Sequence, residues 1–136
     1  MPYHIEQIGD APIIVCSFKA PVDIIRDPFD AHADVVAIVE AQGFTPPIYV
    51  IAELSEVKPN FSDLVIGMAN SISHVRDGRS VWDPDFTNIL VGTAPLLKLL
   101  ANSMGQKQYG HIPVHVFETL EEAIAFASED LRVHPR

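Results

Sequence analysis

The sequence has a single cysteine and few basic side chains. Cys16 lies in the apolar run 13–18 and has no second cysteine to pair with, so we expect a small buried side chain and a reducing compartment. Lys and Arg total 9 and Asp and Glu total 18, which gives a formal net charge of −9. This shortage of positive charge argues against nucleic acid and anionic membrane surfaces as partners.

Long apolar runs and catalytic motifs are also missing. No run approaches the roughly 18 residues that a membrane-spanning helix requires, and the N-terminus lacks the pattern of a signal peptide. The sequence has no nucleophile elbow, phosphate loop or dinucleotide fingerprint. We therefore expect a cytoplasmic protein that is not an enzyme, binds no cofactor and has no membrane partner.

Metal-binding patterns are weak as well. His111 and His115 are four residues apart, but Pro113 separates them in a segment with a strand pattern, so the spacing of a zinc-binding helix is lost. The sequence Asp83-Pro84-Asp85 is more typical of a turn than of a cation site. We expect no metal centre.

The stretch that remains most informative is 48–72. Its first five residues, Ile48 to Ala52, form a continuous apolar run that is typical of a strand covered on both faces, and hence central in its sheet. The period then becomes helical, with apolar residues at Phe61, Leu64, Val65, Met68, Ala69 and Ile72. A polar elbow, 53–62, joins the two at the expected carboxyl end of the strand, where open α/β sheets tend to place their sites.

The other patterns complete one domain, 1–136. Two strands joined by a turn at Gly9-Asp10 precede a helix that begins with the cap Asp27 and Pro28 and stops at Gly43. Further elements follow in the order strand 89–91, helix 93–104, strand 114–117 and a last helix after the capping box of Thr119 and Glu122. The connection 79–88 shows no clear period.

The fold class is therefore α/β. The expected element order is β-β-α-β-α-β-α-β-α, with a single mixed five-stranded sheet and four helices.

Three segments resemble the STAS domain, the SpoIIAA-like fold of anti-sigma factor antagonists. IYVIAELSEV is similar to the family's strand that ends in an acidic residue, a leucine and a small residue. NILVGTAPLLKLLANSMG resembles its strand, turn and leucine-rich helix, and VHVFETLEEAIAFA resembles its closing strand and helix. The resemblance implies a SpoIIAA/STAS-like fold and a regulatory role.

The resemblance also implies a phosphorylation site. In the family a serine or threonine at the start of the second helix is phosphorylated by a partner kinase that is also the anti-sigma factor, and Ser62 occupies the matching position. Phe61 and Asp63 depart from the family pattern on either side of it, which indicates a diverged member. The alternative interpretation of Ser62 is a hydroxyl at a helix start, beside the cap candidate Asn60.

Two groups of residues are candidates for partner or ligand binding. The first belongs to the elbow and its helix start and consists of Glu53, Ser55, Asn60, Phe61 and Asp63. The second combines two guanidinium groups with the only tryptophan and consists of Arg76, Arg79 and Trp82. Alternatively, Trp82 covers the core and the arginines offset neighbouring aspartates.

The leading hypothesis is a non-enzymatic regulatory module that engages a protein partner, such as a kinase-type anti-sigma factor, through elbow 53–62. The alternative is a small-molecule or lipid-binding module with a pocket near Phe61, Met68 and Trp82. A mean hydropathy of +0.18 and the apolar Trp82 segment also lead us to expect self-association, with a dimer as the first candidate.

Overall fold

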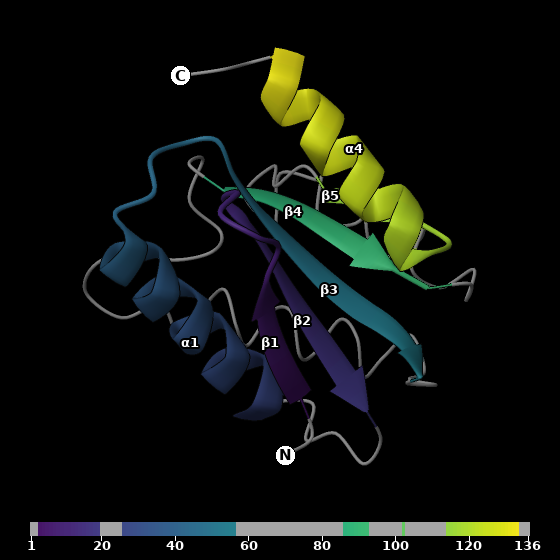
Figure 1. Ribbon diagram of the computed structural model, residues 1–136. Helices are drawn as coiled ribbons and strands as arrows, with labels where there is room; N and C mark the ends of the chain where they lie inside the picture. The colour runs from purple at the N-terminus through teal and green to yellow at the C-terminus, as the bar shows by residue number, and fades with distance from the viewer. Residues whose placement is uncertain (1–2, 20–25, 57–85, 93–101, 103–113, 134–136) are drawn as a thin grey trace.

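The computed structural model describes residues 3–19, 26–56, 86–92, 102 and 114–133. These residues form one five-stranded sheet with the strand order β1-β2-β3-β4-β5 (Figure 1). The strands are β1 (Tyr3–Gln7), β2 (Ile13–Lys19), β3 (Ile48–Glu56), β4 (Phe86–Val91) and β5 (Val114–Phe117). The pair β1–β2 is antiparallel and the other three pairs are parallel, so the predicted mixed α/β sheet is confirmed.

Two helices pack against this sheet, α1 (Arg26–Gln42) and α4 (Leu120–Val133). Figure 1 shows them on opposite sides of the strands. The predicted helices beginning near Phe61 and at 93 lie outside the described residues, apart from Asn102, so four helices and a STAS topology stay predictions.

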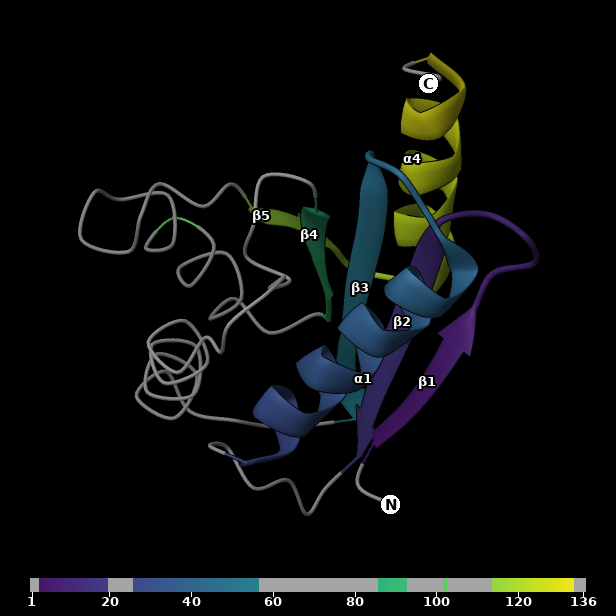
Figure 2. The ribbon, with the colours of Figure 1, turned by 90° about the vertical axis from the view of Figure 1, so that its left-hand side faces the viewer.

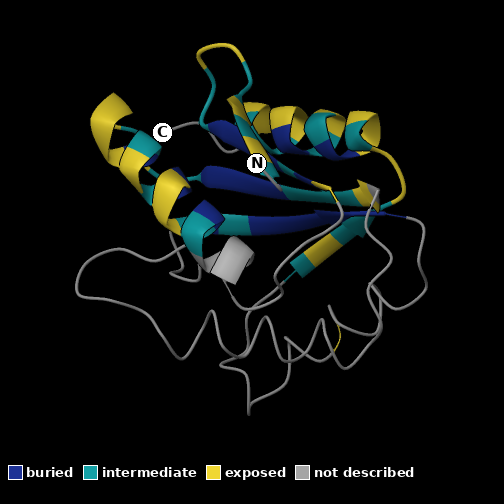
Figure 3. Cartoon of the chain, turned by 90° about the horizontal axis from the view of Figure 1, so that it is seen from below, coloured by how far each residue is buried: buried dark blue, intermediate teal, exposed yellow. Residues whose placement is uncertain are grey.

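The alternation of side chains along the strands divides the core into two parts. In β2, Ile14, Cys16 and Phe18 pack on the α1 side, whereas Ile13 and Val15 pack on the α4 side. Successive residues of a strand point to opposite faces, so a continuous apolar run supplies both layers. Figure 3 shows the buried residues concentrated in the strands and on the sheet-facing sides of the helices.

β3 is the central strand, as its sequence predicts. Ile48 and Val50 belong to the α1-side core, and Tyr49 and Ile51 belong to the α4-side core. Three of these four side chains are 0% exposed and Val50 is 3% exposed. β3 lies between β2 and β4 and pairs with both in parallel, so neither its edges nor its faces meet solvent over this stretch.

The end of α1 follows from one glycine. Gly43 has a φ of 69°, a backbone conformation that glycine adopts without a steric penalty. The amides of Gly43 and Phe44 donate to the carbonyls of Glu40 and Val39, which is the pattern of a Schellman motif. Phe44 then packs on the same core as Val39, so the chain turns directly towards β3.

The start of α4 confirms the predicted cap. The Thr119 hydroxyl accepts a hydrogen bond from the Glu122 amide at 3.2 Å and donates to the Glu122 carboxylate at 3.1 Å. Here the glutamate therefore reaches the side chain of the cap residue. One apolar stripe of α4 packs on the sheet, because its members all belong to the α4-side core: Leu120, Ala123, Ile124, Ala127 and Leu131.

Three predicted boundaries are wrong. The polar elbow was predicted to begin at Glu53, but β3 continues to Glu56, so residues 53–56 belong to the strand. The connection 79–88 was predicted to continue through Asn88, but β4 already begins at Phe86. Phe86 and Asn88 are both buried, and Thr87 between them is half-buried. Because Asn88 is polar, the sequence does not show the apolar alternation that would predict a strand here. The first helix begins at Arg26, two residues before the predicted start at Pro28, so Asp27 lies inside its first turn.

Cys16 is a buried core residue, as predicted. Its side chain is 1% exposed and packs on the α1 side of β2. Burial, together with the nearby negative charge of Asp34, raises the pKa of the thiol to about 12. At neutral pH the thiol is therefore protonated and a poor nucleophile.

Candidate functional site

Polar side chains occupy adjacent strands near the carboxyl ends of β2 and β3. The register places Ser17 opposite His4 of β1 on one side and opposite Glu53 of β3 on the other. Neighbouring strands are about 4.8 Å apart, so these three residues form one row across the sheet. Together with Ser55, two residues after Glu53, they are called the carboxyl-end patch below.

His4, Ser17 and Glu53 of the patch face the same side of the sheet as α4. Ile13 and Val15 precede Ser17 at odd positions of β2, and Tyr49 and Ile51 precede Glu53 at odd positions of β3, all in the α4-side core. The same row continues from Glu53 to Val91 and Phe117, which pack in that core. The row therefore changes from apolar beneath α4 to polar towards β1.

The four patch residues are accessible. His4 and Ser55 are exposed, and Ser17 and Glu53 are half-buried. The apolar side chains of α4 do not cover the patch, because they pack in the core at the other end of the row, with Val91 and Phe117. The surface left open by α4 is thus the polar one.

β3 extends beyond its neighbour at this point. Its last pair with β4 is Glu53 with Val91, the final residue of β4, while β3 continues to Glu56 beside Lys19 of β2. A strand that outruns its neighbour leaves ladder groups to be satisfied in another way. The Glu53 carboxylate accepts a hydrogen bond from the Ser55 amide at 2.7 Å, where the register between β2 and β3 shifts between Ser17 and Lys19.

The patch offers hydrogen-bonding groups and not an activated nucleophile. The His4 imidazole lies 3.9 Å from the Glu6 carboxylate, between Nε2 and Oε1, and the Glu53 carboxylate is engaged with the Ser55 amide. Within the described part of the chain no hydrogen bond joins the Ser17 hydroxyl to His4 or Glu53. The Ser17 hydroxyl can donate and accept hydrogen bonds, and the Glu53 carboxylate can accept them.

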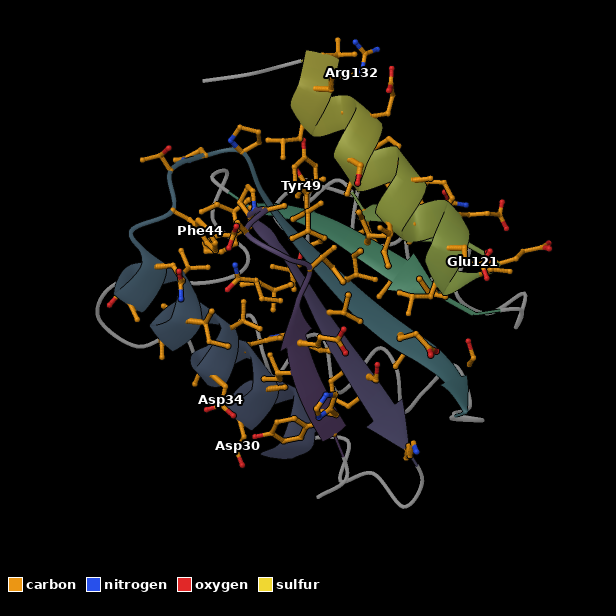
Figure 4. The ribbon with its side chains drawn as sticks, viewed as in Figure 1. Asp30, Asp34, Phe44, Tyr49, Glu121 and Arg132 are labelled. Atoms are coloured by element: carbon orange, nitrogen blue, oxygen red, sulfur yellow. The ribbon has the colours of Figure 1, made fainter. Side chains whose placement is uncertain are left out.

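A part-buried hydrogen bond joins β3 to the far end of α4. The Tyr49 hydroxyl donates to the Asp130 carboxylate at 2.6 Å, and Figure 4 shows the Tyr49 side chain reaching from β3 towards α4. Burial, followed by this hydrogen bond and the charge of Asp130, raises the pKa of the Tyr49 phenol. The hydrogen bond thus attaches the C-terminal part of α4 to the beginning of β3, away from the carboxyl-end patch.

α1 has a matching but more exposed attachment. The Tyr3 hydroxyl of β1 donates to the Asp34 carboxylate of α1 at 2.8 Å. Figure 4 labels Asp34 and Asp30 on the part of α1 that lies beside β1. The half-buried His32 is on the same helix, and burial lowers the pKa of its imidazole to about 4.

Of the predicted binding residues, the structure places Glu53 and Ser55, and both belong to the carboxyl-end patch. The others lie outside the described residues: Asn60, Phe61, Ser62, Asp63, Met68, Arg76, Arg79 and Trp82. The predicted pocket near Phe61, Met68 and Trp82 therefore also lies outside the described residues. Among the residues that are described, no group of three potential metal-ligating side chains occurs.

Sequence reasoning missed His4 and Ser17 as members of this site. Ser17 is the only residue with a side-chain hydroxyl in the apolar run 13–18, and it lies at the position of β2 that faces the polar end of β3. Placing β2 and β3 side by side in parallel brings Ser17 to Glu53. Polar residues thus mark the end of each of these two strands in the sequence. The strand order is what shows that Ser17 and Glu53 lie side by side.

The part of the chain that the structure describes contains no helix long and apolar enough to cross a membrane. Comparison with protein-family models, curated proteins and solved structures found no match to this chain.

Proposed function

We propose that the protein is a non-enzymatic regulatory module that binds a protein partner through the carboxyl-end patch and the elbow 53–62, whose first four residues form the end of β3. The resemblance of IYVIAELSEV to the corresponding strand of STAS domains supports this role. The mixed α/β sheet, with this segment as its central strand, is compatible with it. The proposal carries the predicted elbow forward and adds His4 and Ser17 to it.

The observation that carries the proposal is the polar extension of β3. Ser55 is exposed, its amide is held by Glu53, and the extension has no β4 residue beside it after Val91. A strand end whose amide is already hydrogen-bonded loses less conformational entropy when a partner contacts it. Rigid scaffolds of this kind commonly present recognition residues at the carboxyl ends of their strands.

The charge of the patch indicates the chemistry of the partner surface. Glu53 and the neighbouring Glu6 lie on the same face, and the chain carries a net charge of −9. A partner surface with arginine or lysine side chains complements these carboxylates and associates faster at low ionic strength. Phosphorylation of Ser62, within the elbow 53–62, adds negative charge to the proposed binding segment and regulates its affinity for such a partner.

Site-specific photo-crosslinking tests the proposal. A photoreactive amino acid replaces Ser55 in one variant and Ala37, an exposed residue of α1, in a matched control. In cells or lysate of the source organism with ATP, we expect position 55 and not position 37 to form a discrete protein adduct, and mass spectrometry of the recovered protein reports whether Ser62 carries phosphate. Equal adducts at both positions, or none at position 55, contradict the proposal.

A further inference from the structure

We propose that β1 is a self-association edge, through which two copies of this chain pair their β1 strands antiparallel about a two-fold axis at Ile5. This inference does not rest on the proposed function. The partner is a second copy of this chain, because the β1 edge is complementary to itself in both its backbone and its charges.

The first observation is the position of β1. It is the terminal strand of the sheet, and within the described residues it pairs with β2 alone. Figure 2 shows β1 along the outer border of the sheet. An edge strand presents a row of backbone donors and acceptors that can pair with another strand.

The second observation is the phase of the β1–β2 hydrogen bonds. The Ile8 amide donates to the Ile13 carbonyl at 2.9 Å, so Ile8 and Ile13 form a hydrogen-bonded pair. Hydrogen-bonded and non-hydrogen-bonded pairs alternate along an antiparallel ladder, and Ile5 pairs with Cys16 three positions along. Ile5 is therefore in a non-hydrogen-bonded pair with β2, and its amide and carbonyl point to the open edge.

A two-fold axis at Ile5 uses those outward groups. Ile5 then faces the partner's Ile5, and each donates its amide hydrogen to the other's carbonyl, as in the closely spaced pairs of an antiparallel sheet. The Ile5 side chains lie on the α1 side, where each already packs against the apolar core. Two apolar β-branched side chains are thereby placed beside each other across the interface.

The third observation is the charge pattern on the opposite face. With the axis at Ile5, His4 lies opposite the partner's Glu6, and Glu6 lies opposite the partner's His4. The two side chains are 75% and 64% exposed in one chain and already approach each other within it, at 3.9 Å. A neutral imidazole and a protonated one both donate a hydrogen bond to a carboxylate, so the pairs are favourable in either state.

Shifting the register removes this match. An axis at His4 places His4 opposite the partner's His4, and an axis at Glu6 places two carboxylates opposite each other. Like charges directly across a strand pair are destabilising. Axes at His4, Ile5 and Glu6 all pair the outward backbone groups, but among these three only the axis at Ile5 also places His4 opposite Glu6.

Charge reversal at one position tests the register. We expect the wild type to be a dimer at micromolar concentration in analytical ultracentrifugation. His4→Glu places two glutamates opposite Glu6 residues and should weaken the dimer about tenfold or more, because both cross-strand pairs become repulsive. The double variant His4→Glu with Glu6→His restores the pairs and should restore the dimer.

The matched control is Ala37→Glu, which adds a carboxylate on the exposed side of α1 and should leave the dimer unchanged. Circular dichroism checks that all variants are folded. A monomeric wild type overturns the proposal, and so does a dimer that His4→Glu leaves as tight as before.

Disulfide trapping locates the same interface independently of affinity. Residues in a non-hydrogen-bonded antiparallel pair have Cα atoms about 4.5 Å apart, within the range that a disulfide spans. Mixing a His4→Cys variant with a Glu6→Cys variant should yield a covalent dimer under mild oxidation, whereas either variant alone should yield little. Cys16 does not interfere because it is buried. No covalent product from the mixture contradicts the proposed register.

Discussion

The two faces of the sheet are built from the same strands but are covered differently. On the α1 side, apolar residues extend from Tyr3 and Ile5 of β1 to Phe86 of β4. On the α4 side, the apolar surface extends from β2 to β5 and gives way to His4, Ser17 and Glu53 at one corner. The extent of the apolar residues on each face thus shows where a helix packs and where polar surface is left uncovered by it.

The helix attachments differ in the same sense. Tyr49 is fully buried where it reaches Asp130 of α4, whereas Tyr3 is half-buried and its bond to Asp34 of α1 is exposed. A hydrogen bond to a charged group contributes more to stability where water cannot replace it. The four predictions below use this contrast, beginning with the largest effect.

The largest effect should come from removing apolar volume on either face. Ile48→Ala on the α1 side and Ile51→Ala on the α4 side should each lower the free energy of unfolding by about 2–5 kcal/mol, because both side chains are fully buried. Ser17→Ala, on the α4 side but outside the core, should change it by less than about 0.5 kcal/mol. Urea unfolding measures all three changes. A small loss of free energy of unfolding in Ile48→Ala would show that the side chains on the α1 side do not form a core.

The second effect separates the two attachments. Tyr49→Phe should lower the free energy of unfolding by about 1.5–3 kcal/mol, since it removes a buried donor to the Asp130 carboxylate. Tyr3→Phe removes a comparable but exposed hydrogen bond and should cost about 0.5–1 kcal/mol. Thermal and urea unfolding of the two variants provide the measurement. Equal losses of free energy of unfolding would show that the two hydrogen bonds stabilise the fold equally.

The third effect appears at opposite ends of the pH scale. Burial favours neutral His32, so the stability it contributes is complete above pH 6.5 and is lost as the pH falls towards about 4. The raised pKa of Tyr49 acts in the other direction: its contribution is complete below pH 10 and is lost as the pH rises further. Each slope should reach at most about 1.4 kcal/mol per pH unit.

Variants assign these slopes to their residues. His32→Gln should flatten the acid limb of stability against pH, and Tyr49→Phe should flatten part of the alkaline limb. Cys16, whose pKa is raised from 9.0 to about 12, accounts for a further alkaline part that Cys16→Ala removes. An acid limb that persists unchanged in His32→Gln would contradict the assignment.

The smallest effect concerns the helix ends. Thr119→Ala removes the hydroxyl that caps α4 and should cost about 1 kcal/mol. Thr119→Ser keeps the hydroxyl and is the matched control, with an expected change of a few tenths of a kcal/mol. If both variants lose the same stability, the cap hydroxyl does not stabilise α4.

The elements with strong local patterns could be predicted from the sequence. The run from Ile48 and the capping box at Thr119 specify their elements through nearby residues alone, and both were confirmed. The start of β4 could not be predicted in this way, because Asn88 is a polar residue at a buried position. Its burial depends on tertiary neighbours that a local pattern does not contain.

The candidate site shows the same limit. Glu53 and Ser55 were predicted because they follow a recognisable strand. His4 and Ser17 were missed, because their membership depends on the order β1-β2-β3 and on the register that aligns the strands. Periodicity reports which face a side chain occupies, but not which other segment lies beside it.

The most direct test of the central claim is amide hydrogen exchange with and without the partner recovered through position 55. The claim is that the polar corner of the α4 side, and not the surface of α1, is the recognition surface. Binding should slow exchange in residues 53–56 and leave residues 35–42 of α1 unchanged. Protection that appears on α1, with no change in residues 53–56, would contradict the account.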